Sequence, residues 1–259
     1  MIWTHSLDPT AFSVGFLDVR WYGIAYAGAF LLGWLYLRRL SKKGGPSLSL
    51  KQAEDLIFAI ILGVIIGGRI GYFLLYNPVD LFSLKIFKIW QGGMSFHGGL
   101  SGVLLAIGYL ARRWRKSFFE LTDLIVIPVT IGLLLGRLGN FINGELWGRQ
   151  VEGTWGVIFP LADETPRHPS QLYEAAKNLI IAGTLFLTFR QRPRRGVLSF
   201  LFLTLYGFGR ILVELFWRES LDGFILGIPK GAFYSLPVLI VGIAGLIWVN
   251  SKIQDARNK

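Results

Sequence analysis

The chain has 259 residues, of which 53% are hydrophobic, and its formal net charge is +11. Its mean hydropathy of +0.50 is too apolar for a typical soluble domain, and the basic residues gather in short loops between apolar runs, which excludes a soluble nucleic-acid binder. The sequence has no cysteine, so disulfides, thiolate metal sites and a cysteine nucleophile are also excluded.

Seven apolar stretches follow one another along the chain, each long enough, at roughly 17–22 residues, to cross about 30 Å of hydrocarbon. The first and third are short, and the fifth begins with polar residues. We therefore predict an all-α integral membrane protein, a bundle of seven transmembrane helices in a single polytopic domain over residues 1–259, with an external loop or small cap at 147–170. Residues 1–18 lack a basic segment before an apolar core, so no cleavable signal peptide is expected. The predicted spans cover residues 22–37, 53–75, 95–110, 121–141, 171–189, 196–216 and 235–250.

The basic residues between the spans predict the orientation of the bundle. Sixteen of them lie on one predicted side and seven on the other. Because cytoplasmic loops carry the excess of Lys and Arg, we expect the N-terminus outside and the C-terminus in the cytoplasm. The cytoplasmic set is Arg38, Arg39, Lys42, Lys43, Lys51, Arg112, Arg113, Arg115, Lys116, Arg190, Arg192, Arg194, Arg195, Lys252, Arg257 and Lys259. The external set is Arg20, Lys85, Lys88, Arg149, Arg167, Arg218 and Lys230.

The polar residues inside the spans share one depth. A rise of 1.5 Å per residue from the cytoplasmic end places Arg137 about 28 Å along its span, Arg69 about 24 Å and Arg210 about 21 Å. His97 and Tyr22 begin their spans on the outer side. An ionisable group at such a depth is costly unless it is paired or faces a cavity, so the sequence predicts a functional site facing the outer leaflet.

The stretch from Gly136 to Arg149 concentrates polar groups at the outer end of the fourth span. Arg137 and Asn140 share one helix face, and Glu145 follows them. A guanidinium grips a phosphate through two parallel hydrogen bonds, whereas a lone arginine at a helix end more often anchors the helix at the headgroups. The flanking glycines and polar neighbours favour the first interpretation. We predict that this stretch binds an anionic headgroup.

Tyr206, Arg210 and Glu214 follow one another at intervals of four residues and form a stripe on the sixth span. Arg210 and Glu214 could form an internal ion pair that satisfies itself, and this interpretation weighs about as much as a functional one. If Arg210 faces Arg137, two cations would neutralise one phosphate diester.

Glycine pairs bracket His97 in the run Gly92–Gly99. A neutral imidazole can take a proton near pH 7, although a structural, hydrogen-bonded histidine at a helix start is the alternative. The glycines indicate a close approach of backbone or ligand and favour the functional interpretation. Three scattered histidines, with His168 more readily explained as structural, argue against a metal site.

Glycines at positions 63, 67 and 71 recur at every fourth position, which is chiefly a helix-packing device. Arg69 lies within this ladder. It is predicted to be either a third phosphate contact or the partner of a carboxylate such as Glu145.

At these motifs the chain resembles the prolipoprotein diacylglyceryl transferases of bacteria, over essentially its whole length. The resemblance depends on several long motifs that occur in the right order. They are Trp21-Tyr22-Gly23, Gly67–Tyr72, Gly92–Gly99, Gly136–Arg149, Arg167–Glu174, and Tyr206–Arg210 followed by Glu214.

The resemblance implies an enzyme that moves the diacylglyceryl group of phosphatidylglycerol onto the lipobox cysteine thiol of a prolipoprotein signal peptide, forms a thioether and releases glycerol 1-phosphate. It implies no metal and no cofactor, and action at the outer face of the bacterial plasma (inner) membrane. The implied partners are phosphatidylglycerol, prolipoprotein signal peptides and membrane lipids, with no nucleic acid. The oligomeric state is not implied, and a monomer is consistent with the sequence.

By the same resemblance, Arg137 binds the phosphate with support from Arg210. The full lipid-binding set that we expect is Arg137, Asn140, Glu145, Gly148, Tyr22 and Arg69, and the expected catalytic set is His97, Tyr206, Arg210 and Glu214. The attacking thiol must become a thiolate, for which His97 is the candidate base and Tyr206 the second choice. The run Leu215–Arg218 departs from the Phe-Phe-Arg of many relatives, so the resemblance assigns Arg218 no role. A second departure is Ala232, which stands where many relatives have glutamine.

A transporter or lipid-binding membrane protein with a polar cavity is the rival interpretation, since it also accounts for intramembrane arginines. Such a protein would spread polar residues through both leaflets or interrupt its helices near the midplane. The clustering in the outer half argues against it.

Overall fold

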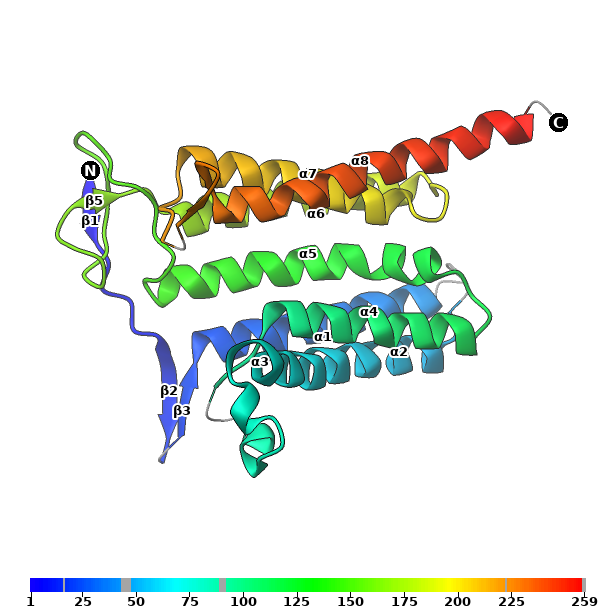
Figure 1. The fold of residues 1–259 in the computed structure, drawn as a ribbon, viewed down its shortest axis with the longest axis horizontal. Coiled ribbons are helices and arrows are strands. Elements are labelled where there is room, and N and C mark those ends of the chain that lie inside the picture. Colours follow the sequence, from blue (N-terminus) through cyan, green and yellow to red (C-terminus); the bar gives the residue numbers. More distant parts are fainter. Residues whose placement is uncertain (16, 43–47, 89–91, 222, 258–259) are drawn as a thin grey trace. The chain divides into compact units, whose positions relative to one another are not determined.

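The computed structural model describes residues 1–15, 17–42, 48–88, 92–221 and 223–257, and most of these residues are helical (Figure 1). Lys43 and Lys259, two of the predicted cytoplasmic cations, lie outside the described residues. The chain forms two compact units. Unit 1 comprises Met1–Ala29 and Ile125–Lys259, and unit 2 comprises Phe30–Leu124.

Every predicted span falls on a helix to within one residue at either end. Four helical segments of the described chain are long and apolar enough to cross a membrane, namely Leu50–Tyr76, Phe118–Ile142, Val197–Phe216 and Lys230–Ser251. The other three helices are those whose spans looked short or polar in the sequence. The helices are α1 (Trp21–Lys42), α2 (Leu50–Leu62), α3 (Gly68–Tyr76), α4 (Phe96–Arg113), α5 (Phe118–Ile142), α6 (Ser170–Arg190), α7 (Val197–Phe216) and α8 (Lys230–Arg257), and a π-helical turn, Gly63–Gly67, joins α2 to α3 without a break.

In unit 2, the glycine ladder brings α4 into backbone contact with the continuous helix α2–α3. A Cβ built on Gly67 would lie 2.4 Å from the carbonyl oxygen of Gly98, and one on Gly71 would lie 2.5 Å from the Cα of Gly98. Gly63 meets Gly102 in the same way, at 2.9 Å. No larger residue fits at these crossings, which confirms the interpretation of the ladder as a helix-packing device.

In unit 1, α7 and α8 pack closely through small residues on both helices. A Cβ on Gly207 would lie 2.9 Å from the backbone nitrogen of Leu239, and one on Gly242 would lie 2.5 Å from that of Thr204. The buried side chains of Leu198 and Val213 fill α7's inner face. This contact fixes the rotation of α7, and therefore the direction in which Arg210 and Glu214 point.

Short strands, which the sequence analysis did not predict, accompany the helices. In unit 1, β1 (Ile2–Thr4) pairs in parallel with β4 (Gly156–Ile158), and β4 pairs antiparallel with β5 (Pro166–Arg167). Two of these strands belong to the segment that we expected to form a cap. The His5 ring nitrogen Nε2 lies 2.7 Å from the Phe141 carbonyl oxygen, which fastens this sheet to the end of α5. Two hairpins complete the set, β2 (Thr10–Val14) with β3 (Leu17–Arg20), and β6 (Phe224–Ile225) with β7 (Ile228–Pro229).

Candidate functional site

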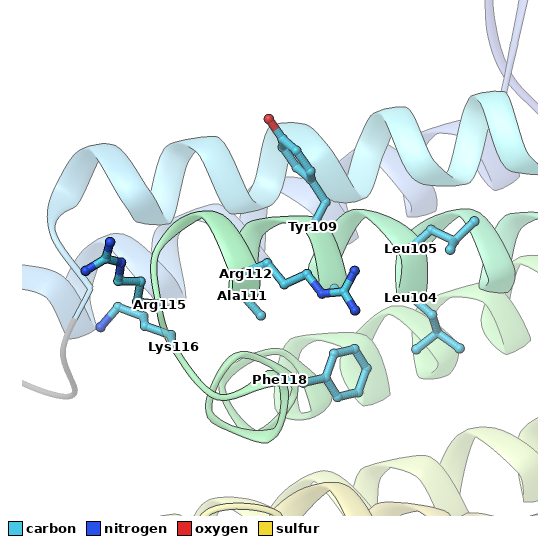
Figure 2. A pocket seen from close by; sticks show the side chains of 9 residues that line it. Leu104, Leu105, Tyr109, Ala111, Arg112, Arg115, Lys116 and Phe118 are labelled. Atoms are coloured by element: carbon cyan, nitrogen blue, oxygen red, sulfur yellow. The ribbon is translucent and has the colours of Figure 1, made fainter.

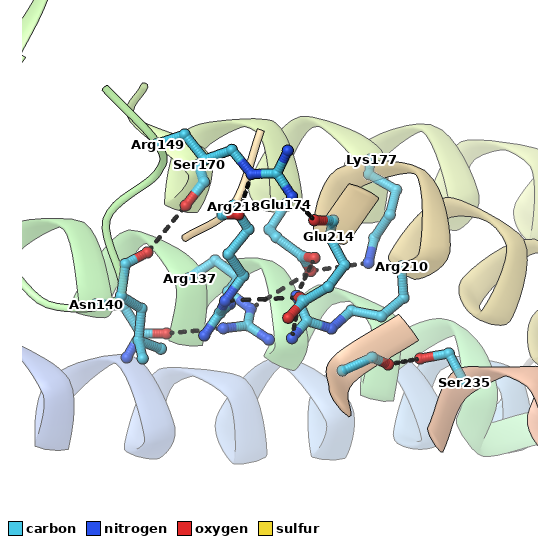
Figure 3. A network of polar contacts seen from close by, with 12 residues as sticks. Arg137, Asn140, Arg149, Ser170, Glu174, Lys177, Arg210, Glu214, Arg218 and Ser235 are labelled. Carbon is cyan, nitrogen blue, oxygen red and sulfur yellow. Dashed lines mark hydrogen bonds and ion pairs between the residues drawn. The ribbon is translucent and has the colours of Figure 1, made fainter. Parts of the chain in front are cut away.

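A buried cluster of charged side chains from α5, α6 and α7 lies within unit 1 (Figure 3). Its centre is Glu174, in the first turns of α6, whose side chain has no exposed surface. Arg210 Nη1 lies 2.8 Å from Oε1 of this carboxylate, and Lys177 Nζ lies 2.8 Å from Oε2. Arg137 Nε approaches Oε2 at 3.6 Å. One carboxylate therefore holds cations from three helices.

Glu214 is the second carboxylate of the cluster. Its Oε2 lies 2.8 Å from Arg210 Nη2 and 3.7 Å from Arg218 Nε. A Cβ on Gly231, in the first turn of α8, would lie 2.5 Å from the Glu214 carboxylate, so only glycine leaves room for it. The internal ion pair, one of the two interpretations of this stripe, is present, but Arg210 also reaches Glu174 and is held between two carboxylates.

The charges of this cluster do not balance. Four cationic side chains, Arg137, Lys177, Arg210 and Arg218, face the two carboxylates, which leaves a surplus of two positive charges. Buried charge that lacks a counter-ion is costly in a protein interior. An anion bound at the cluster would remove that cost.

Arg137 is the cation with the least committed donors. Its side chain is 18% exposed, more than those of the other three cations, and its contacts are long: 3.4 Å to Asn140 Oδ1 and 3.6 Å to Glu174. Good N–H···O hydrogen bonds measure 2.7–3.2 Å. The guanidinium fork of Arg137 can therefore turn to a ligand without breaking a strong bond.

Asn140 connects Arg137 to the segment that follows α5. Its amide donates to Glu145 Oε1 at 2.8 Å, and Asn143 donates to the same oxygen at 3.2 Å. The Glu145 carbonyl oxygen in turn accepts a 2.7 Å hydrogen bond from Gln171 Nε2 in α6. These bonds join Asn140 to Glu145 and attach the glycine-rich segment to α6.

Gly148 lies where three segments of the backbone meet. Its N–H donates to the His168 carbonyl at 2.8 Å, and its carbonyl accepts from Arg167 Nη1 at 3.1 Å. A Cβ at this position would lie 2.5 Å from the carbonyl oxygens of both His168 and Trp217, so any larger residue would separate the segments. Gly148 thus has a structural reason to be glycine.

Two ionisable groups beside this junction, outside the helices, have shifted pKa values. The Arg167 guanidinium, 2.6 Å from Asp163 Oδ2, holds the pKa of the Asp163 carboxyl well below its usual range. Burial lowers the pKa of His168, whose Nδ1 lies 3.1 Å from the Tyr173 hydroxyl. A neutral His168 that bonds to Tyr173 agrees with the structural role expected for it.

Tyr22 and Tyr206 have different neighbours within unit 1. Tyr22 packs on α5, where a Cβ on Gly139 would lie 2.8 Å from its ring, and its hydroxyl lies 3.2 Å from that of Tyr26. Tyr206 lies one turn before Arg210 on α7, and Lys177 Nζ is 4.3 Å from the centre of its ring. Tyr206 is therefore in contact with the cation cluster through Lys177.

Arg69 and His97 belong to unit 2. Arg69 is buried, and its five N–H donors bond to five backbone carbonyls of the segment after α3, those of Lys85, Ile86, Lys88, Gly92 and Gly93. This arrangement leaves no N–H for a phosphate or for Glu145, the two partners that the sequence predicted. His97 is exposed in the first turn of α4, which begins at the Ser95 cap.

Sequence reasoning missed Glu174 as the centre of the cluster and did not consider Lys177. The available signal was the polar start of the fifth span, where these two charged residues lie three positions apart, one turn before the apolar run that begins at Leu179. Among the described residues, no group of three His, Cys, Asp or Glu side chains could hold a metal ion.

The amino-acid sequence of the chain is similar to those of known proteins. The family model described as prolipoprotein diacylglyceryl transferase matches residues 9–248. The curated relatives that the chain matches include several proteins named phosphatidylglycerol–prolipoprotein diacylglyceryl transferase, three of which illustrate the similarity. The protein of Oleidesulfovibrio alaskensis is 45% identical over 94% of this chain and 93% of its own length, and that of Nitrosomonas europaea is 45% identical over 93% and 89%. The protein of Rickettsia canadensis is 43% identical over 92% and 95%.

Proposed function

Because the chain belongs to the prolipoprotein diacylglyceryl transferase family, we propose that it transfers the sn-1,2-diacylglyceryl group of phosphatidylglycerol to the lipobox cysteine thiol of a prolipoprotein. The sulfur forms a thioether with the glycerol carbon that carries the phosphoester. The C–O bond to the phosphate breaks, and glycerol 1-phosphate leaves. The observation that carries this proposal is the surplus of positive charge around Arg137, which suits a lipid phosphate.

Arg137 binds the phosphate in this proposal, and Arg210 supports it. Arg210 pairs with Glu174 and Glu214, both at 2.8 Å, so its guanidinium is held in a fixed position from which its charge can attract the phosphate. Arg137 has only long contacts and an exposed edge, so its fork is available for two parallel hydrogen bonds to phosphate oxygens. Preorganised cations of this kind stabilise the charge that grows on the leaving phosphate.

The other predicted lipid-binding residues form the surroundings of Arg137. Asn140 lies beside Arg137 and is held in place by its 2.8 Å hydrogen bond to Glu145. Tyr22 packs against Gly139 on the same helix, α5. Gly148 acts through the backbone junction that it makes possible. For Arg69 we now propose a positioning role, since its donors organise the segment that leads to His97.

The base that removes the thiol proton is His97 or Tyr206. His97 is exposed at the start of α4, so it is accessible to a substrate thiol. Tyr206 has a cation, Lys177, over its ring and lies one turn from Arg210. Arg210 and Arg218 both face Oε2 of Glu214, so this carboxylate is engaged by cations and is a poor candidate for the base. We assign Glu214 the role of positioning Arg210.

We also propose the full topology expected from the sequence: one polytopic domain of seven transmembrane helices with a small external cap, in the bacterial plasma membrane. The N-terminus and the site lie outside, and the C-terminus lies in the cytoplasm. Because the sequence has no cysteine, this topology can be tested by introducing one cysteine at a time. A membrane-impermeant maleimide applied to intact cells should label Leu161→Cys and spare Gln191→Cys, and the reverse pattern would contradict the orientation.

The function itself is tested by turnover. Purified protein receives phosphatidylglycerol and a lipobox peptide, and released glycerol phosphate is measured. Wild type should release it, Arg137→Ala should not, and Arg20→Ala, which removes an exposed arginine outside the cluster, should behave as wild type. No release by a folded wild type would contradict the transferase, and full release by Arg137→Ala would remove Arg137 from the site.

A further inference from the structure

A groove in unit 2 lies at the end of α4 that leads to α5 (Figure 2), and none of its lining residues belongs to the cation cluster. It has a volume of about 650 Å³ and is lined by the last turns of α4, the turn that follows and the first residue of α5. The site proposed above uses none of these residues.

One end of the groove is apolar and open. Its wall includes Leu104 and Leu105, which are 44% and 74% exposed. Gly108, one turn further along α4, leaves the floor bare, because a Cβ built there would meet nothing within 4 Å. Apolar side chains exposed on a membrane helix face hydrocarbon, so this end suits an acyl chain.

The other end of the groove is cationic. Arg112, Arg115 and Lys116 line it, and Figure 2 shows the Arg112 side chain extended along α4 toward Leu104, with Arg115 and Lys116 pointing the other way. Lys116 pairs with Glu120 at 3.3 Å, whereas Arg112 and Arg115 form no ion pair within the described part of the chain. Two of the three cations that line the groove therefore have no ion-pair partner among the described residues.

The backbone of this turn carries an arginine at a position where glycine is usual. The Lys116 N–H donates to the Ala111 carbonyl at 2.9 Å and the Arg115 N–H to the Arg112 carbonyl at 3.2 Å, which is the Schellman pattern of a helix end. Arg115 takes the left-handed position, with φ of 54°, where glycine is usual. The chain thus places a basic residue in the turn that borders the groove, at a backbone position that disfavours it.

We propose that this groove binds a two-chain anionic phospholipid, with its phosphate at the cationic turn and an acyl chain along Leu104 and Leu105. The Arg112 side chain reaches toward Leu104 (Figure 2), so a phosphate held by its guanidinium would place the start of an acyl chain on the leucine wall. Charge complementarity selects the anionic headgroup, and the apolar wall selects a lipid over a free phosphate. With the proposed orientation, the lipid belongs to the cytoplasmic leaflet, opposite the transferase site.

The test is photolabelling in phosphatidylcholine nanodiscs that contain a minor fraction of phosphatidic acid with a diazirine in its acyl chain. Labelled peptides are mapped by mass spectrometry, and phosphatidylcholine with the same diazirine is the reference lipid. Residues 104–118 should take up severalfold more label from phosphatidic acid. Because the readout is local and needs no turnover, it is independent of the proposed function and of lipid at Arg137.

Two pairs of variants separate a built site from general attraction. Gly108→Phe fills the groove without changing charge and should abolish the excess label, whereas Gly183→Phe, at an equally open glycine of α6, should leave it unchanged. Gln at Arg112, Arg115 and Lys116 together should also abolish it, at about fivefold per cation. Gln at Arg190, Arg192 and Arg194, a second basic turn, should not.

Three results would overturn the proposal. Equal labelling by the two lipids would show an ordinary lipid-facing surface. An excess that survives Gly108→Phe would place the lipid elsewhere on the unit. An equal loss from both sets of Gln variants would show that net charge, and not this groove, attracts the lipid.

Discussion

Replacing Glu174 by glutamine removes one of the two carboxylates of the cluster while keeping the side-chain shape. Arg210 and Lys177 each lie 2.8 Å from this fully buried group, and both cations stay buried after the change. Removing one partner of a buried ion pair costs about 3–5 kcal/mol, because the remaining charge is desolvated and uncompensated. The surplus of the cluster rises from two to three positive charges, so we expect a loss of that size in the free energy of unfolding.

The assay is unfolding of the purified protein in detergent, followed through the fluorescence of its nine tryptophans. The matched control is Glu219→Gln. The Glu219 carboxylate lies 3.1 Å from Arg167, and its side chain is 38% exposed. An exposed pair of this kind contributes about 0–1 kcal/mol. The loss for Glu174→Gln should also be insensitive to salt, since buried charges are poorly screened. If the two variants lost the same stability, Glu174 would not be the centre of the cluster.

A double variant with Lys177→Met extends this test. Removing the ammonium together with the carboxylate should recover part of the loss, with a coupling energy of about 0.5–3 kcal/mol. Strict additivity would show that the 2.8 Å contact between the two side chains does not carry the effect.

Four other predictions follow from the site. Arg137→Lys keeps the charge but loses the fork, so turnover should fall about tenfold or more, and near-normal turnover would rule out two-point phosphate binding. Gly148→Ala places a Cβ 2.5 Å from two carbonyl oxygens and should cost about 1–3 kcal/mol of stability in detergent, whereas Gly136→Ala, in open space, should cost none. Because the pKa of His168 is lowered in the folded state, the unfolded chain binds more protons, and stability should fall as pH drops below about 6.5; His168→Gln should flatten this part of the stability–pH curve. His97→Ala should lower turnover about 100-fold if it is the base, and unchanged turnover would exclude it and leave the tyrosine of α7.

The sequence predicted those contacts that the helical period determines. Arg210 and Glu214 are four residues apart, and the structure pairs them at 2.8 Å. Arg137 and Asn140 are three residues apart and lie within 3.4 Å. Within one helix, spacing alone sets which side chains meet, so a single sequence carries this information.

Contacts between helices were beyond the sequence. Glu174 meets Arg210 across 36 residues, and no period in either helix reports which faces turn toward each other. The pairing of β1 with β4 joins segments more than 150 residues apart through strands of three residues, which are too short to show a pattern. Depth alone predicted that Arg69 belongs to the outer-leaflet site, but it could not reveal that backbone carbonyls would take all five of its donors.

The charge of the cluster bears on how the proposed reaction is accelerated. The phosphodiester of phosphatidylglycerol carries one negative charge, and the released glycerol phosphate, a monoester, carries close to two at neutral pH. The cluster has a surplus of two positive charges, so its charge is matched by the leaving group and only half matched by the substrate. Interactions that strengthen as the C–O bond breaks lower the barrier, whereas those equally strong before and after only tighten binding. On the proposed mechanism, two carboxylates against four cations would therefore stabilise the transition state more than the bound lipid.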